Sequence, residues 1–230
     1  MLKKRLVSII LIIVLSFTSI GVYGDIDISA KASLLMDFSS GDIIYAMNEH
    51  EKLAPASITK IMTLLLCMEA LETEKIKLDD KVFISDHASK MVGTKVYLDA
   101  GETQTVENLI KAISVRSAND GAVALAEHIA GSEEAFVKLM NKRSKELGMK
   151  NTNFSNASGL PAENHYTTAY DIAIMSRELL KHEKIKGYLS VYMEDLTVGK
   201  SKKSVQTMVN TNRLIKEYDG SNGIKTGFTN

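Results

Sequence analysis

The stretch of sequence that most constrains the fold is a predicted helix with almost no polar face. After Pro55, the residues from Ile58 to Leu71 are apolar nearly all round. A helix that is hydrophobic on every side is buried in a protein rather than laid on its surface. We therefore expect this segment to lie in the core, with other elements packed around it.

The composition agrees with a globular protein that has such a core. Of the 230 residues, 45% are hydrophobic, 24% are charged and 6% are aromatic, which is neither a disordered nor a collagen-like composition. Basic and acidic residues number 28 each, so the formal net charge is zero. A neutral chain without a long basic run argues against nucleic acid as the main partner.

The N-terminal segment has the layout of a secretory signal peptide. Basic residues at positions 3–5 precede an apolar run from Leu6 to Phe17, and small or tolerated residues end at Gly24. We expect residues 1–24 to be removed and residues 25–230 to act outside the cytoplasm, in the cell wall or at the outer face of the membrane. The alternative is an uncleaved anchor, because the apolar run is not far short of the roughly 20 residues that a spanning helix needs.

The predicted elements run in the order strands, helices, strands. Two apolar stretches, Ala32 to Asp37 and Asp42 to Ala46, flank Ser39-Ser40-Gly41 and predict a β-hairpin. The tail from Tyr188 onward alternates and predicts further strands, with a turn at Gly199. This segregation favours an α+β fold with an antiparallel sheet over alternating βαβ units.

Apolar spacing and capping residues predict the helices of the middle region. The segment from Val106 to Ser117 has an amphipathic pattern, with Thr105 as its N-cap. The other predicted elements are short strands or extended loops at 79–85 and 95–98, helices at 123–130 and 136–147 that end at Gly131 and Gly148, and a helix that follows a capping box of Thr168 and Asp171.

Ser57-Ile58-Thr59-Lys60 opens the buried helix and brings a hydroxyl and an amine together. Residues three apart lie on one face of a helix, so we expect Ser57 and Lys60 to be within reach of each other. A serine hydroxyl is a weak nucleophile until a base takes its proton. Lysine can be that base only when it is neutral, which requires burial or a neighbouring cation. Taken alone, the pattern also fits a serine cap beside an exposed lysine.

Two further groups of residues could reach the same site. Ser117-Ala118-Asn119 lies in the break between two predicted helices, where a serine could relay a proton and an asparagine could hold an amide. Lys225-Thr226-Gly227 lies on a late predicted strand and offers a cation, a hydroxyl and a backbone that a ligand can approach. Taken alone, Ser117-Ala118-Asn119 is explained equally well as a turn that caps the next helix. Lys225-Thr226-Gly227 alone is weak evidence for a functional site.

The three groups in this order match the motif set of penicillin-binding proteins and class A β-lactamases. From Ala32 onward the sequence resembles the D-alanyl-D-alanine carboxypeptidases of peptidase family S11, most specifically at residues 55–63, 117–120, 148–159 and 223–229. The resemblance implies a β-lactamase/transpeptidase-like fold, in which helices and a helical subdomain flank an antiparallel sheet.

The resemblance also implies a role for each residue of the motifs. The implied roles are acylated nucleophile for Ser57, base for Lys60, proton relay for Ser117, substrate binding for Asn119, Lys225, Thr226 and Gly227, and a backbone oxyanion hole at Ser57 and Phe228. The implied reaction removes the terminal D-alanine of a peptidoglycan pentapeptide that ends in D-Ala-D-Ala. β-Lactam antibiotics are the other implied ligands.

No metal or cofactor is expected. The five histidines show no metal-ligand spacing. Cys67, the single cysteine, lies in the apolar helix, where packing is its expected role. Glu163 is not expected to act as a deacylating glutamate, because Ser-Ala-Asn stands here in place of the Ser-Asp-Asn of class A β-lactamases.

Two alternatives stay open: a serine β-lactamase of the same superfamily, and an incomplete, non-catalytic chain that at most binds peptidoglycan. In the resembled family two more strands and a helix follow the Lys-Thr-Gly strand, and many members then carry a membrane anchor. Here Gly227 lies three residues before the end of the sequence. We therefore expect residues 25–230 to form an incomplete catalytic domain without that anchor, poorly folded or inactive unless the rest is supplied.

Overall fold

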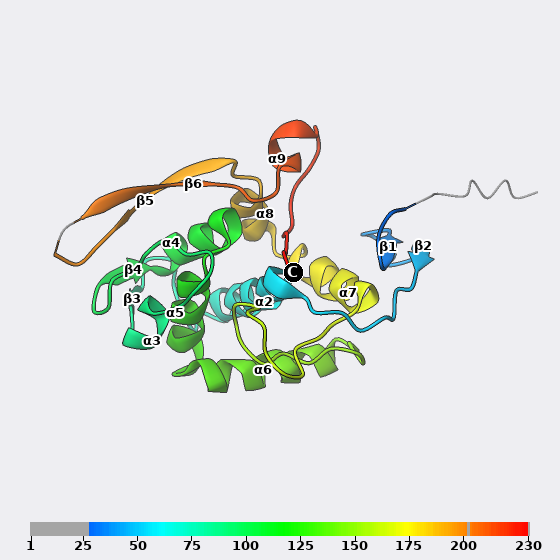
Figure 1. The fold of residues 1–230 in the computed structure, drawn as a ribbon, viewed down its shortest axis with the longest axis horizontal. Helices are drawn as coiled ribbons and strands as arrows, with labels where there is room; N and C mark the ends of the chain where they lie inside the picture. The colour runs from blue at the N-terminus through cyan, green and yellow to red at the C-terminus, as the bar shows by residue number, and fades with distance from the viewer. Residues whose placement is uncertain (1–27, 202, 230) are drawn as a thin grey trace, which may run out of the picture. The chain divides into compact units, whose positions relative to one another are not determined.

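The buried helix is α2, Lys60–Glu72, which continues from a short 3₁₀ turn, η1, Ala56–Thr59. The computed structural model describes residues 28–201 and 203–229, so the predicted signal peptide lies outside the described residues. Helices α5, α6 and α7 contact α2 from different sides, as Figure 1 shows. Most of the α2 side chains are buried, which confirms the prediction made from its apolar pattern.

The remaining helices are mostly those that the apolar spacing predicts. They are α3 (Asp86–Ser89), α4 (Val106–Lys111), the π-helical turn η2 (Ala112–Arg116), α5 (Asn119–Ala130), α6 (Glu133–Glu146), α7 (Ala169–Leu179), α8 (Glu183–Leu189) and α9 (Leu214–Glu217). Helix α5 begins four residues before its predicted start at Val123. The short helices α3, α8 and α9 were not predicted. No described helix is long and apolar enough to cross a membrane.

The predicted caps are largely confirmed. Thr105 Oγ1 accepts a hydrogen bond from the Asn108 N–H at the start of α4, and Thr168 Oγ1 accepts one from the Asp171 N–H at the start of α7. The predicted capping box is only half formed, because the Asp171 carboxylate instead accepts from Asn151 N and Thr152 Oγ1. Each of the two threonine bonds satisfies a backbone N–H group that has no partner within the first turn of its helix.

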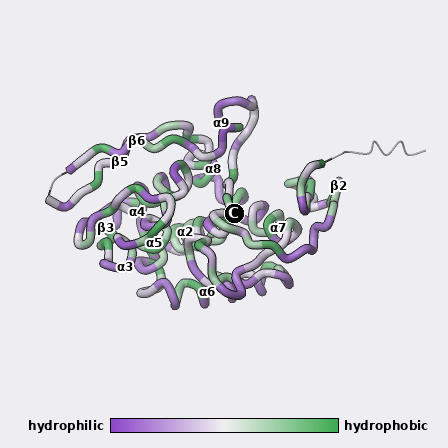
Figure 2. The backbone as a smooth tube through the Cα atoms, viewed as in Figure 1, coloured by the Kyte–Doolittle hydropathy of each residue, from purple (hydrophilic) through white to green (hydrophobic). Residues whose placement is uncertain are grey.

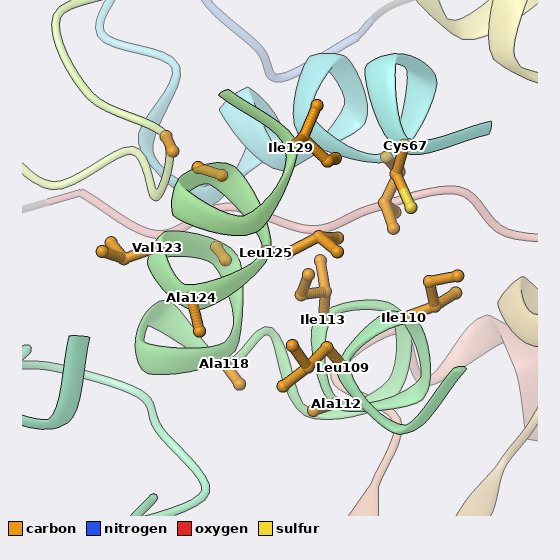
Figure 3. Close-up of a cluster of buried hydrophobic side chains, with 14 of the residues drawn as sticks. Cys67, Leu109, Ile110, Ala112, Ile113, Ala118, Val123, Ala124, Leu125 and Ile129 are labelled. Carbon is orange, nitrogen blue, oxygen red and sulfur yellow. The ribbon is translucent and has the colours of Figure 1, made fainter. Parts of the chain in front are cut away.

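The core is built where α2, α4, η2 and α5 meet. Figure 3 shows Leu109, Ile113 and Leu125 directed toward one another, with Cys67 of α2 at the same cluster. The Cys67 side chain is fully buried, and burial raises the pKa of its thiol above the usual range. A buried neutral thiol is unreactive, so the expected packing role of Cys67 is confirmed.

The described strands form three antiparallel pairs. These are β1 (Ser33–Met36) with β2 (Ile43–Met47), β3 (Lys81–Phe83) with β4 (Thr103–Thr105), and β5 (Met193–Val198) with β6 (Ser204–Val209). The α+β class and the antiparallel pairing are therefore confirmed. Figure 2 colours the apolar residues of β1 and β2 green on both strands of their hairpin.

One expected strand is absent from the described residues, and one segment that was expected to be a short strand or an extended loop is a loop. Residues 95–98 form an extended loop, in which the N–H groups of Val96 and Leu98 donate to the Asp120 carboxylate instead of to a neighbouring strand. The segment around Lys225-Thr226-Gly227 also has no regular secondary structure, so its prediction as a strand was wrong. A strand is defined by its pairing, and no described strand lies hydrogen-bonded to this segment.

Candidate active site

Ser57 and Lys60 meet at the junction of η1 and α2. Lys60 Nζ lies 3.1 Å from Ser57 Oγ. Ser57 is half-buried, whereas the Lys60 side chain has no exposed surface at all. The helical spacing predicted this pair, and the structure places a hydroxyl at hydrogen-bond distance from a fully enclosed amine.

The Lys60 amine has two further partners. Its Nζ atom lies 2.7 Å from Asn119 Oδ1 and 2.5 Å from the carbonyl oxygen of Ser158. A neutral amine has two N–H donors and one lone pair. The two carbonyl-type oxygens can only accept, so they take the two donors, and the lone pair is left for the hydroxyl proton of Ser57. In the neutral form the lone pair of the amine therefore faces Ser57 Oγ, whereas a charged amine donates to all three oxygens.

The electrostatics of the site favour the same neutral form. Burial is the main reason that the pKa of Lys60 is lowered to about 7, and the neighbouring charge of Lys225 lowers it further. The Asp120 carboxylate opposes this shift. Because an ordinary lysine titrates near 10.4, Lys60 is unusual in having a large neutral fraction at neutral pH.

Ser117 and Asn119 lie where η2 ends and α5 begins. Ser117 adopts the left-handed backbone region, with φ of 65°, and its buried Oγ has no hydrogen-bond partner among the described residues. Asn119 is held from two sides, because its Nδ2 donates to Val92 O at 2.7 Å and its backbone N–H donates to Thr94 O at 2.8 Å. The turn η2 that ends at Ser117 is π-helical, and π-helical turns often occur at functional sites.

The segment from Lys225 to Phe228 runs beside η1. A Cβ atom on Gly227 would lie 3.0 Å from Pro55 O and 3.1 Å from Ile58 Cγ1, so only a small residue fits there. Thr226 Oγ1 donates to Thr211 Oγ1 at 2.8 Å, and the Phe228 side chain is exposed. Burial lowers the pKa of Lys225 to about 8. In Figure 1 this end of the described chain runs down from α9 to the mark C, near the start of α2.

The structure thus brings most of the predicted residues to one place. Hydrogen bonds join Lys60 to Ser57 and Asn119, charge couples it to Lys225, and Gly227 packs on the start of the serine-bearing turn. No hydrogen bond joins the Ser117 hydroxyl to this group in the described part of the chain. Nor does that part hold three histidine, cysteine, aspartate or glutamate side chains clustered as for a metal ion.

Sequence reasoning singled out residues 148–159 by their resemblance to the family but assigned no role to the Ser158 carbonyl in this loop. Gly159 follows it with φ of +85°, and a Cβ there would lie only 1.9 Å from Ala56 O. Within this loop, Asn156 Oδ1 accepts from the N–H groups of Ser158 and Gly159. The available signal was an asparagine three residues before a glycine, which is typical of a tight turn held by its own side chain.

Comparison with solved structures identifies the class of proteins that share this fold. A crystal structure of the D-alanyl-D-alanine carboxypeptidase DacD from Francisella tularensis superposes with a TM-score of 0.84 at 29% identity, covering 90% of this chain and 61% of that one. Penicillin-binding protein 5 from Haemophilus influenzae superposes with a TM-score of 0.81 at 35% identity, covering 88% and 58%. The fold is that of the penicillin-binding and transpeptidase proteins.

The chain belongs to the peptidase S11 family, described as D-alanyl-D-alanine carboxypeptidase, whose family model matches residues 20–230. The D-alanyl-D-alanine carboxypeptidase DacF of Bacillus subtilis is 52% identical over 200 residues, which are 87% of this chain and 51% of that protein. DacC of Escherichia coli is 36% identical over 209 residues, or 88% and 51%. The chain spans about half the length of these curated relatives.

Proposed function

We propose that this chain carries the acylation site of a serine-type D-alanyl-D-alanine carboxypeptidase. The substrate is a peptidoglycan stem peptide ending in D-Ala-D-Ala, and β-lactams acylate the same serine. The observation that carries the proposal is the set of contacts around Lys60, whose amine lies 3.1 Å from Ser57 Oγ with two oxygen acceptors on its other sides. Family membership supports the choice of substrate.

Acylation begins with proton transfer from Ser57 to Lys60. The neutral amine takes the hydroxyl proton as Oγ attacks the carbonyl carbon of the bond between the two D-alanines. The backbone N–H groups of Ser57 and Phe228 are the proposed donors to the oxyanion that forms. Asn119 keeps the amine in line with the hydroxyl, since its Oδ1 accepts from Nζ at 2.7 Å.

The leaving amine needs a proton before D-alanine departs. Ser117 is the proposed relay, because its hydroxyl is buried and has no hydrogen-bond partner in the described residues to compete for it. The proton travels from the Lys60 ammonium through this hydroxyl to the amine. Water then attacks the acyl-serine, with Lys60 again as the base, and the shortened peptide is released.

The other end of the site binds charge. Lys225 offers a cation to the terminal carboxylate of the substrate or to the carboxylate of a β-lactam, and Thr226 adds a hydroxyl beside it. Gly227 lets the segment approach the serine-bearing turn closely. A stem peptide in the cell wall is reached only outside the cytoplasm, so the proposal includes export directed by residues 1–24.

Labelling with a fluorescent penicillin tests this proposal on the gene product, meaning the purified protein translated from the whole reading frame. We expect one covalent label per molecule, absent in Ser57→Ala and retained in Ser204→Ala, which alters an exposed serine on β6. A D-Ala-D-Ala peptide should release D-alanine with the same dependence on Ser57. Absence of labelling, or labelling that survives Ser57→Ala, overturns the proposal. Rapid release of hydrolysed antibiotic would indicate a β-lactamase instead.

A further inference from the structure

The segment Ala157-Ser158, whose Ser158 carbonyl is the third partner of the Lys60 amine, is held in place by hydrogen bonds with side chains. The Ala157 carbonyl accepts from Thr63 Oγ1 at 2.7 Å, and the Ser158 N–H donates to Asn156 Oδ1 at 3.2 Å. The Ser158 carbonyl accepts from Lys60. Both residues are buried and belong to no helix or strand. Their position is therefore set by these side chains, because no ladder of backbone hydrogen bonds fixes it.

The fourth polar group of this segment, the Ala157 N–H, donates to Glu133 on another helix. Glu133 is the first residue of α6, and its Oε1 accepts from Ala157 N at 2.9 Å. Its other oxygen, Oε2, lies 2.7 Å from His87 Nε2 of α3. The Glu133 side chain is 16% exposed and that of His87 is 57% exposed. Both carboxylate oxygens are thus engaged, one toward the site and one toward the surface.

We propose that Glu133 is a positioning residue, which holds the Ser158 carbonyl against the Lys60 amine. This inference rests on the proposed function, because the purpose of that contact is to aim the lone pair of Lys60 at Ser57. A bond from an N–H group to a carboxylate is stronger than one between neutral groups. Removing the carboxylate would also leave a buried N–H without a partner, which favours movement of the segment.

Three variants of the gene product isolate this role. Glu133→Ala removes the acceptor, and Glu133→Gln keeps an amide oxygen for the Ala157 N–H. Glu134→Ala is the matched control, because Glu134 is the next residue of the same helix and its exposed side chain pairs with Lys138 on that helix. Rapid-mixing measurements with a penicillin separate the dissociation constant of the initial complex from the first-order acylation step.

We expect Glu133→Ala to slow the acylation step by about tenfold or more, with the dissociation constant changed by less than about twofold. Glu133→Gln should recover most of the rate, and Glu134→Ala should keep all of it. A purely structural role for Glu133 would not confine the loss to the chemical step. Unchanged acylation in Glu133→Ala, or acylation in Glu133→Gln as slow as in Glu133→Ala, overturns the proposal.

A second measurement does not depend on acylation. NMR titration of the Lys60 ε-carbon, assigned with Lys60→Arg, should give a higher pKa in Glu133→Ala than in the unmodified protein. The direction follows because burial is the main cause that lowers this pKa, and a displaced segment admits water. If the unmodified protein is not acylated, the proposed function fails, and this titration alone decides the role of Glu133. An unchanged pKa then overturns it.

Discussion

At Lys60, the presence of one proton decides whether Ser57 can be activated. The pKa of Lys60 is lowered to about 7, so the neutral, basic form grows as pH rises through that value. The pKa of Lys225 is lowered to about 8, so its charge is lost above that value. We expect the second-order rate of penicillin acylation to rise with pH through about 7 and to fall above about 8, giving a narrow bell-shaped profile.

Lys225→Met provides the control for this profile. Without the neighbouring charge, Lys60 holds its proton more tightly, so the rising limb should move to higher pH while the falling limb disappears. Lys216→Met, which removes a cation from α9, should leave both limbs in place. A rate that is constant across the neutral range in the unmodified protein would contradict the assignment of Lys60 as the base.

The residues of the site were predictable only where side-chain spacing carries the information. Ser57 and Lys60 follow from the helical period, and Asn119 follows from its place in a break between helices. The Ser158 carbonyl could not be predicted in this way, because every residue has a carbonyl and its position depends on contacts between distant segments. Glu133 is hidden for a related reason, since a glutamate in the first turn of a helix is common without any function.

At the scale of elements, the approach of the Ser158 loop to η1 depends on Gly159. Gly159 and Gly148 both have positive φ angles, of 85° and 76°. A Cβ on Gly148 meets nothing within 4 Å, whereas one on Gly159 would lie 1.9 Å from Ala56 O. An alanine at either position costs about 1–2 kcal/mol for the left-handed backbone. Only Gly159→Ala adds the overlap.

We therefore expect Gly159→Ala to lower the free energy of unfolding by about 1–3 kcal/mol more than Gly148→Ala does. It should also abolish most penicillin acylation, because the loop that holds Lys60 must move away from the serine-bearing turn. Denaturant unfolding and fluorescent penicillin labelling of both variants check this. Equal stability and equal labelling of the two would mean that the close approach is unimportant.

Sequence reasoning succeeded for the helices with regular apolar spacing and for the β1–β2 hairpin, and it failed for short helices and for the segment around Lys225. Helices α4 to α7 have regular apolar spacing and cap residues, and they lie near their predicted positions. Helix α8 is short, and it lies next to a tail that was predicted as strands throughout. Residues 224–227 carry strand-like side chains, but strand formation depends on a neighbouring strand, which no local pattern in the sequence specifies.

For the molecule as a whole, the helical core and the β1–β2 hairpin differ in how much of their apolar side-chain surface is buried. The core encloses α2 almost completely, so the side chains of the helix that carries Lys60 are mostly buried. The hairpin is tied at its turn, where Arg177 donates to the carbonyl oxygens of Phe38 and Ser39. Its apolar side chains are left largely open, and Ile44 is 66% exposed.

This uneven cover gives a prediction for the 230-residue chain. Leu35, Ile43 and Ile44 are exposed apolar side chains on one hairpin, and exposed apolar side chains on a hairpin favour binding of hydrophobic dyes and association with other chains. We expect the isolated chain to bind such a dye and to self-associate, as measured by dye fluorescence and by light scattering after gel filtration. The expected poor folding or inactivity of this chain stays a prediction, which the same samples test by thermal melting and penicillin labelling.

Substitution of Ile44 by lysine separates hairpin exposure from general instability. Ile44→Lys should reduce dye binding and self-association, because it replaces an apolar side chain of the hairpin that is 66% exposed with a charged one and leaves the buried core unchanged. Leu214→Lys is the matched control, since Leu214 is 52% exposed but lies on α9, away from the hairpin. If both variants behave alike, association arises from general unfolding. If only Ile44→Lys is monomeric, the open hairpin is its cause, and the helical core that holds Ser57 and Lys60 is folded independently of it.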